Sequence, residues 1–388
     1  MTMHVKVTAV SNRQASTMFV QEGTRRLALH FPDIQWEVDD DNPEIVFFLS
    51  GGSEQTAIAR LRPDRLTLLL AGFHDNAYAA ALEVKAWAGS RDVPVALVSL
   101  QEAMDGSLLK HFAMVCEGFR TLQGKRAGLI GDVSHWLVAS ALSEQLARER
   151  LGIIVEHLPW KELPDYRRFL PDPEFMEVYR NHPAGNLEKE AGIYSFLKQL
   201  LHDHRLDALT LECFEMVNAH DMTACLALAL LNSKGTAAGC EGDLVSLAGM
   251  MLVQALTGQI PWMANVAGIF DDRVLFAHCT APLDVLGGYR LNTHFETGKS
   301  AAIEGKLAME QVTVFRLSEK LNKAFVAPGS IVSQPSHDFA CRTQTEISLT
   351  TQDIEKLRQE PLGNHHLILP GNKVTLLRMA CQYKQMLC

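Results

Sequence analysis

Residues 244–256 constrain the fold more than any other part of this sequence. They read LVSLAGMMLVQAL, which is apolar on nearly every face, so a helix formed here must be buried on all sides. The stretch is too short to cross a bilayer, which takes about 20 apolar residues. The chain is therefore expected to fold around this helix.

Candidate ligands flank the helix on both sides. Glu241 and Asp243 come directly before it, Asn265 ends the next short apolar strand, and His278 ends the strand after that. Strand ends and helix starts are where α/β proteins hold reactive side chains rigidly. Two interpretations remain open from the residues alone. The acids interact with the positive end of the helix dipole, or this stretch forms half of a divalent-metal site.

Length, charge and cysteine usage limit the class of protein. The 388 residues exceed what a single core organises, so two or three domains are expected. The formal net charge of −9 makes nucleic acid and anionic membrane surfaces poor partners. No signal peptide is evident, and the eight cysteines lie far apart without a CxxC pair. We therefore expect a cytoplasmic protein with reduced thiols and no thiolate zinc site.

The alternation of short apolar runs with helical patterns predicts an α/β fold. Residues 1–122 and residues 123–268 each read as a doubly wound, Rossmann-like domain with a parallel sheet. From residue 269 to residue 388 the strands become short and closely spaced, which is typical of an antiparallel sheet or small barrel. A terminal helix is predicted from near Asn372.

Polar residues follow two apolar runs of the first domain. Glu54 comes after the run 45–49, and His74 and Asn76 come after the run 66–71. Carboxyl ends of neighbouring parallel strands are where such sheets bind ligands, so contact with a small ligand is one interpretation. Turn and cap chemistry is the other.

A pair of histidines enters a late apolar strand. His365 and His366 are adjacent, so they point to opposite faces of the strand and only one can face a given site. A core histidine is the common outcome, and a ligand is the alternative.

These motifs, in this order, resemble the L-fucose/L-arabinose isomerase superfamily. The resemblance rests on the order of EGD at 241–243, the polar Asn265, His278 and the late GxHH at 363–366. HFETG at 294–298 and CRTQ at 341–344 resemble the shorter, fucose-isomerase-like branch. The likeness covers the whole chain in domain order and is most specific between residues 240 and 366.

The resemblance implies aldose–ketose isomerisation at a Mn²⁺-type divalent metal. Glu241 matches an acidic ligand that also moves a proton, and Asn265 matches the position of a second acidic ligand and base. His278 and His366 match the histidine ligands. In such chemistry the cation polarises the sugar oxygens, and a carboxylate moves the C2 proton to C1 through an ene-diolate.

Asn265 departs from the superfamily pattern, because an amide carries no charge and takes no proton near neutral pH. Asp243, Asp271 or Asp272 could substitute, or Glu241 could act alone. The alternative function is therefore a sugar-binding or regulatory relative without turnover. A two-lobed periplasmic-type binding protein fits less well, because no signal peptide is evident and the C-terminal region is rich in strands.

Substrate and oligomer complete the expectations. The expected partner is a small sugar, and the resemblance implies a homo-oligomer, a trimer or hexamer, in which the N-terminal domain covers a neighbour's metal site. Six residues are candidate sugar contacts: Glu54, His74, Asn76, Trp136, His294 and His365.

Overall fold

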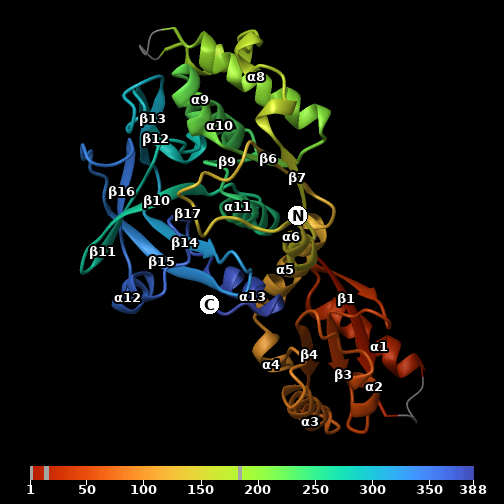
Figure 1. Ribbon diagram of the computed structural model, residues 1–388. Helices are drawn as coiled ribbons and strands as arrows, with labels where there is room; N and C mark the ends of the chain where they lie inside the picture. The colour runs from red at the N-terminus through yellow and green to blue at the C-terminus, as the bar shows by residue number, and fades with distance from the viewer. Residues whose placement is uncertain (1–2, 13–16, 182–185) are drawn as a thin grey trace. The chain divides into compact units, whose positions relative to one another are not determined.

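The computed structural model describes residues 3–12, 17–181 and 186–388. The chain forms two compact units (Figure 1). The first comprises Met1–Arg120 and Thr375–Leu387, and the second comprises Thr121–Val374 with Cys388. No helix in the described part of the chain has both the length and the apolar character needed to cross a membrane.

The first unit is built on a five-stranded parallel sheet. Its strand order is β2-β1-β3-β4-β5. The central strands are buried on both faces, as their continuous apolar sequences require. The strands are β1 Met3–Val10, β2 Ile34–Val38, β3 Ile45–Phe48, β4 Thr67–Ala71 and β5 Val95–Ser99. The helices are α1 Thr17–His30, α2 Glu54–Ile58, α3 Ala77–Gly89, α4 Leu100–Ala103, α5 Ser107–Leu122, which runs into the second unit, and α13 Val374–Tyr383.

The last helix, α13, packs on the first unit and not on the strands that precede it in sequence. The Tyr383 ring stacks on Phe119 with centroids 5.2 Å apart, and the Tyr383 carbonyl accepts the Leu66 N–H at 3.0 Å. The helix predicted from near Asn372 is thus present. It packs on the first unit, whose sheet lies more than 250 residues earlier in the sequence.

The second unit begins with a four-stranded parallel sheet in the order β7-β6-β8-β9. Its strands are β6 Arg126–Ile130, β7 Ile154–Leu158, β8 Ala208–Leu211 and β9 Ala237–Cys240. The helices among them are α6 Glu144–Leu151, α7 Pro173–Tyr179, α8 Glu188–Asp203, α9 Cys213–His220, α10 Cys225–Ser233 and α11 Leu244–Thr257. The prediction of parallel, Rossmann-like sheets is confirmed for both units.

The remaining strands are antiparallel, as predicted for the C-terminal region. Six of them pair in a closed ring in the order β10-β11-β16-β15-β14-β17, where β17 pairs back to β10. The ring strands are β10 Trp262–Ile269, β11 Arg273–His278, β14 Gln311–Leu317, β15 Ala324–Ser333, β16 Thr343–Ser348 and β17 His365–Pro370. A separate two-stranded sheet and one helix complete the unit, with β12 Leu286–Asn292, β13 Ala302–Leu307 and α12 Thr351–Gln359.

Helix α11 lies between the two kinds of sheet, as Figure 1 shows. It packs on β9, β8 and β6 on one side and on β14 and β17 on the other. Every residue from Leu244 to Val253 is buried, which confirms the prediction from its apolar sequence. Residues 121–374 therefore lie together in one compact unit, in which this helix joins the parallel sheet to the antiparallel strands, whereas residues 375–387 belong to the first unit.

Candidate metal centre

The turn between β9 and α11 positions Glu241. Glu241 and Gly242 have φ angles of 59° and 70°, and the Asp243 side chain caps α11 by accepting the Ser246 N–H at 2.7 Å. A Cβ on Gly242 would lie 2.3 Å from the Asp132 carbonyl oxygen, so only glycine fits there. A glutamate in the left-handed region costs on the order of 1–3 kcal/mol, and such strain gathers at functional sites.

Two histidines from the strand ring face the Glu241 carboxylate. Nε2 of His365, at the start of β17, lies 3.5 Å from Glu241 Oε1, and Nε2 of His278, at the end of β11, lies 3.8 Å from the same oxygen. One ligand atom from each of the three residues lies within 4.8 Å of the others. The three side chains are 12%, 0% and 4% exposed for Glu241, His365 and His278. We call Glu241, His278 and His365 the triad.

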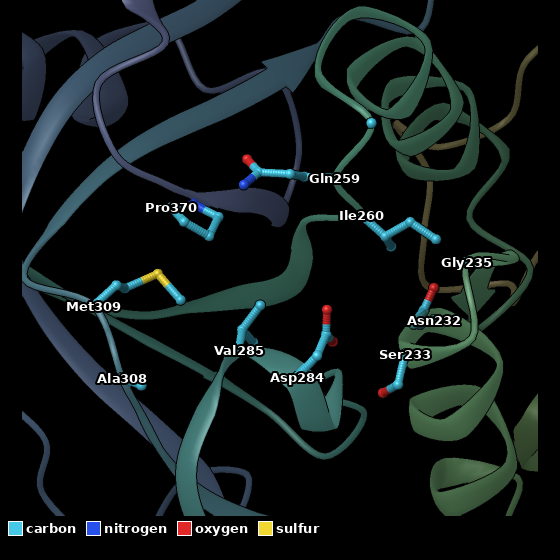
Figure 2. Close-up of a pocket in the computed structure, with 11 residues that line it drawn as sticks. Asn232, Ser233, Gly235, Gln259, Ile260, Asp284, Val285, Ala308, Met309 and Pro370 are labelled. Carbon is cyan, nitrogen blue, oxygen red and sulfur yellow. The ribbon is translucent and has the colours of Figure 1, made fainter. Parts of the chain in front are cut away.

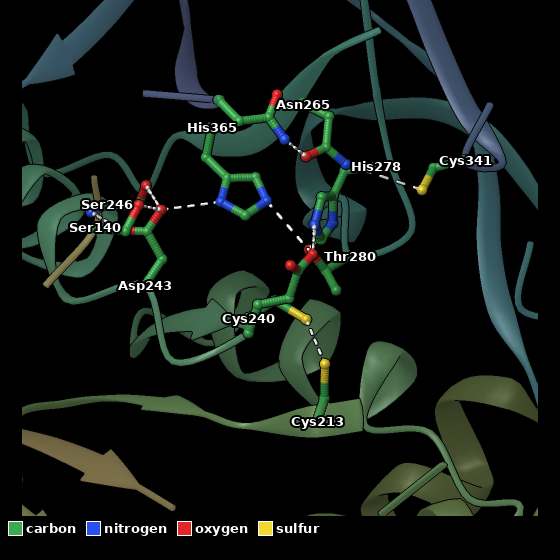
Figure 3. A network of polar contacts seen from close by, with 12 residues as sticks. Ser140, Cys213, Cys240, Asp243, Ser246, Asn265, His278, Thr280, Cys341 and His365 are labelled. Atoms are coloured by element: carbon green, nitrogen blue, oxygen red, sulfur yellow. Dashed lines mark hydrogen bonds and ion pairs between the residues drawn. The ribbon is translucent and has the colours of Figure 1, made fainter. Parts of the chain in front are cut away.

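Oxygen partners orient both imidazoles toward Glu241. His365 Nδ1 donates to Asp243 Oδ2 at 2.9 Å, and His278 Nδ1 and Thr280 Oγ1 share a hydrogen bond of 2.8 Å. Figure 3 shows the His365 ring with a contact from each of its two nitrogens. In its neutral form with the proton on Nδ1, each imidazole would present an Nε2 lone pair toward Glu241, and His365 Nε2 is buried without a hydrogen-bond partner among the described residues. This is how metal-ligating histidines are oriented in proteins, so the residues fit a divalent cation.

The electrostatics of the triad also favour a bound cation. Burial alone would raise the pKa of Glu241, but the imidazoles of His278 and His365 hold that pKa well below its usual range. Burial would lower the pKa of His365, whereas the carboxylates of Asp243 and Glu241 raise it to about 9. Burial lowers the pKa of His278, which keeps this ring neutral. The carboxylates thus stabilise positive charge at the point where a metal ion would lie.

The structure places His365, and not His366, at the site, which corrects the expectation for this pair. His366 packs edge-on against Phe276 and Phe325, with centroids 6.0 and 5.6 Å apart, and its Nδ1 donates to the Asn364 carbonyl at 3.0 Å. Burial lowers the pKa of His366 to about 3. Successive side chains of β17 point to opposite faces of the strand. His365 points toward α11, so His366 points away from it.

Asn265 lies beside the triad but is not one of its members. It pairs with His365 across β10 and β17 and is half-buried. Its Oδ1 accepts the Asn364 side-chain N–H at 2.6 Å, and its Nδ2 faces Cys341 Sγ at 4.0 Å (Figure 3). Asn265 Oδ1, the atom that would bind a metal ion, therefore accepts a hydrogen bond from the Asn364 amide.

The carboxylates considered as substitutes for Asn265 do not lie free at the site. Asp243 is fully buried, and its Oδ2 accepts from His365, Arg316, Ser140 and Ser246. Asp271 and Asp272 are exposed in the β10–β11 turn, where they face Arg358 and Arg273 at 3.7 and 2.9 Å.

Trp136 and His294 flank the triad. The Trp136 indole N–H donates to Glu241 Oε2 at 2.7 Å, although the residue is 43% exposed. Its ring meets Phe214 edge-on at 4.9 Å, and Phe214 meets His294 at 5.6 Å. Burial and the nearby His278 lower the pKa of His294 to about 4, so this imidazole is neutral. An aromatic surface with a neutral imidazole beside a carboxylate is suited to sugar hydroxyls.

The other three candidate sugar contacts belong to the first unit. Glu54 begins α2 and its Oε1 accepts the Gly52 N–H at 3.3 Å, while Asn76 precedes α3 with φ of 58°. His74 and Asn76 are exposed. Within this unit the Glu54 side chain stabilises a turn, whereas the Asn76 side chain makes no capping hydrogen bond.

Residues that sequence reasoning gave no role, or a different one, support the triad. Thr280 and Asp243 orient the histidines, Arg316 pairs with Asp243, and the Cys213 and Cys240 sulfurs lie 3.2 Å apart next to Glu241 (Figure 3). Only Asp243 carried a sequence signal, as the cap of a buried helix. Arg316 and Cys213 are distant from the triad in the chain, whereas Thr280 and Cys240 are close to triad residues but belong to no pattern that marks them.

A separate cavity of about 380 Å³ lies at the other end of α11, where Gly258 ends the helix (Figure 2). Asp284 is its one carboxylate, and burial raises the pKa of this group. None of the triad residues lines this cavity. Its lining residues are Asn232, Ser233, Gly235, Gly258, Gln259, Ile260, Asp284, Val285, Ala308, Met309 and Pro370.

The chain is similar to a curated protein. No family model matches the chain. The chain is 22% identical over 298 residues to the protein named sulfoquinovose isomerase from Clostridium sp. (strain MSTE9). The match covers 71% of this chain and 64% of the relative, so the chain spans less than two thirds of that relative's length. Over most of its length this chain is therefore similar to a protein named as an isomerase of a sugar.

Proposed function

We propose that this chain is a metal-dependent sugar isomerase that interconverts an aldose and a ketose. The observation that carries the proposal is the triad, in which both Nε2 atoms face one Glu241 oxygen and both Nδ1 atoms are held by oxygen partners. The similarity to a sulfoquinovose isomerase supports it. So does the sequence resemblance to the L-fucose/L-arabinose isomerase superfamily and its shorter, fucose-isomerase-like branch.

Glu241, His278 and His365 would hold the cation. One carboxylate and two imidazoles suit a first-row divalent ion such as Mn²⁺ and leave positions for substrate oxygens. When bound, the ion would polarise the carbonyl and the adjacent hydroxyl of the open-chain sugar.

Glu241 is the candidate for proton transfer between C2 and C1. Its Oε1 faces the histidines, whereas its Oε2 faces Trp136, which is partly exposed. The low pKa of Glu241 keeps its carboxylate ionised at neutral pH. Asp243 cannot take this role, because four donors already occupy its Oδ2. Trp136 and His294 are proposed to contact the sugar.

Asn265 favours a second function, a sugar-binding or regulatory relative without turnover. The amide stands beside His365 but can neither add charge nor accept a proton, so only Glu241 remains as a base at the triad. In that case ligand affinity would depend on the metal while no C–H bond is broken.

Exchange of solvent deuterium into C2 of candidate aldoses, with Mn²⁺ present, separates the two functions. The panel includes neutral aldoses and sulfoquinovose. We expect exchange with the wild type and a loss of about 10²–10⁴-fold or more in Glu241→Gln, because a general base is removed. Asn265→Asp is expected to tighten Mn²⁺ binding by adding a charged oxygen. Glu360→Gln, an exposed carboxylate of the same unit, is the control and should match the wild type. Sugar binding without exchange in the wild type would favour the binding relative.

A further inference from the structure

Arg316 is a fully buried cation next to the triad. Its side chain is 1% exposed, and Nη1 lies 3.1 Å from Oδ2 of Asp243, whose side chain is 0% exposed. Isolated buried charges are expensive, and a buried pair is retained only where further hydrogen bonds satisfy it. Here the Asp243 carboxylate also accepts the Ser246 N–H, and Arg316 Nη1 also donates to Ser246 Oγ at 2.9 Å.

The Arg316 guanidinium connects three segments that are distant in the chain. Nη1 donates to the main-chain carbonyl of His365 at 2.8 Å, and Nη2 donates to the Ala139 carbonyl at 3.1 Å and to Ser140 Oγ at 3.0 Å. One side chain on β14 therefore fixes the first residue of β17, the first turn of α11 and the loop before α6. Of these segments, β17 carries His365, and the turn directly before α11 carries Glu241.

The backbone around Arg316 leaves room for this side chain and little else. A Cβ on Gly363, two residues before His365, would lie 2.3 Å from Arg316 Nη2 and 2.7 Å from its central carbon. Gly363 has φ of 143°, which favours glycine. The backbone that leads into β17 therefore lies directly against the Arg316 guanidinium.

We propose that Arg316 is a positioning residue of the metal site, which acts through Asp243 to fix the direction of His365 Nε2. Asp243 Oδ2 receives both the Arg316 Nη1–H and the His365 Nδ1–H, so the imidazole can rotate only if this shared oxygen moves. Arg316 touches neither substrate nor metal in this role. The inference rests on the proposed metal site and adds the residue that holds one of its ligands in place.

A lysine cannot reproduce the arrangement. A guanidinium offers five N–H donors in a planar fork, whereas an ammonium group is a single point of charge. Lysine at 316 could pair with Asp243 but could not reach the His365 and Ala139 carbonyls together. Arg316→Lys therefore keeps the charge and loses the fork, whereas Arg316→Met loses both.

The test combines Mn²⁺ affinity with the NMR signal of the His365 Nδ1–H in metal-free protein labelled with ¹⁵N-histidine. The signal is identified by its absence in His365→Gln. We expect Arg316→Met to lose the signal and to bind Mn²⁺ about 10–100-fold more weakly, as for other partners that orient a ligand. Arg316→Lys should be affected less. Val314→Ala, which shortens a buried side chain on the same strand, reports the effect of lost packing alone.

The proposal is overturned if Arg316→Met keeps the His365 signal and loses no more Mn²⁺ affinity than Val314→Ala. Should the methionine variant fail to fold, the same two measurements on Arg316→Lys decide. Wild-type values in Arg316→Lys refute the role, and a loss beyond the control supports it. Because the signal is read without metal, a wild type that binds no Mn²⁺ would refute the proposed function and leave this test valid.

Discussion

The carboxyl edges of the two parallel sheets carry similar residues and form different structures. In the first unit the polar groups after β1 and β3 form hydrogen bonds with one another. Ser11 and Ser50 hydroxyls lie 2.9 Å apart, and Ser53 Oγ donates to the Ser50 carbonyl at 2.8 Å. In the second unit Glu241, after β9, instead faces two imidazoles from β11 and β17.

This difference shows that the end of a parallel strand is not sufficient for a metal site. The second unit adds antiparallel strands that bring two histidines to the edge, and a buried Asp243–Arg316 pair that holds one of them. Among the described residues of the first unit, no cluster of potential metal ligands is found at the corresponding edge. The comparison predicts which substitutions affect metal binding, and by how much.

The largest effect is expected from replacing each of the two adjacent histidines in turn by alanine. His365→Ala removes a ligand and should lower Mn²⁺ affinity by more than the ~10–100-fold that loss of an outer partner costs. His366→Ala should leave Mn²⁺ affinity near that of the wild type. The free energy of unfolding of this variant should decrease by up to ~2–5 kcal/mol, the loss typical of truncated core side chains, because His366 packs on Phe276 and Phe325. Metal analysis after dialysis and thermal unfolding measure the two effects, and the opposite result would place His366 at the site.

A smaller effect is expected in the pH dependence of stability of metal-free protein. The pKa of His365 is raised to about 9, so its protonation stabilises the fold fully below about pH 6.5 and this stability is lost as pH rises through 9. The pKa of His366 is lowered to about 3, so its contribution is present above about pH 6.5 and is lost as pH falls toward 3.

Melting temperatures measured with a chelator between pH 5 and pH 10 test these signs. His365→Gln should flatten the alkaline side, and His366→Leu should flatten the decline between pH 6.5 and pH 5. Mn²⁺ needs a neutral imidazole, so the stabilisation by Mn²⁺ should grow as pH rises toward 9. An alkaline slope that is identical in the wild type and in His365→Gln would contradict the raised pKa of His365.

The smallest effect is expected in the first unit. Glu54→Gln, His74→Ala and Asn76→Ala should leave Mn²⁺ content unchanged, since none of these residues belongs to the cluster of potential metal ligands found among the described residues. A higher KM at unchanged metal content would support the expected oligomer, in which this unit covers a neighbour's site. Loss of metal in any of the three variants would contradict the contrast between the two edges.

Local sequence patterns predicted most of the framework. The apolar run 244–256 identified a buried helix, and continuous apolar runs ending in polar residues identified the parallel strands. In the C-terminal region, Gly and Pro within strands make those strands hard to predict from sequence. Pro328 and Gly329 interrupt the strand pattern of β15, yet Pro328 pairs with Thr313 in the ring. Strand β12, which contains Gly287 and Gly288, was not predicted.

The candidate site was predicted in part, for a physical reason. Glu241 and His278 lie at element ends that a linear pattern reveals, whereas the choice between His365 and His366 depends on which face of β17 meets α11. That face is set by packing of residues such as Leu367 against α11, where a Cβ on Gly249 would lie 2.8 Å from Leu367 Cδ1. Arg316 was missed because its partners are groups that only the folded chain brings together, and Thr280, two residues after His278, was missed because no sequence pattern marks a hydroxyl as the partner of a ring nitrogen.

The packing of α13 on the first unit affects the order in which a ribosome can complete the two units. Residues 375–387 are translated after the whole of residues 121–374, although Tyr383 covers the Phe112 and Phe119 rings of α5, a helix of the first unit that is translated early. Throughout synthesis of the second unit, the nascent first unit must therefore expose the apolar surface that Tyr383 later covers. A ribosome that stalls before residue 375 releases a chain with all the strands of the first sheet and without the helix that closes it.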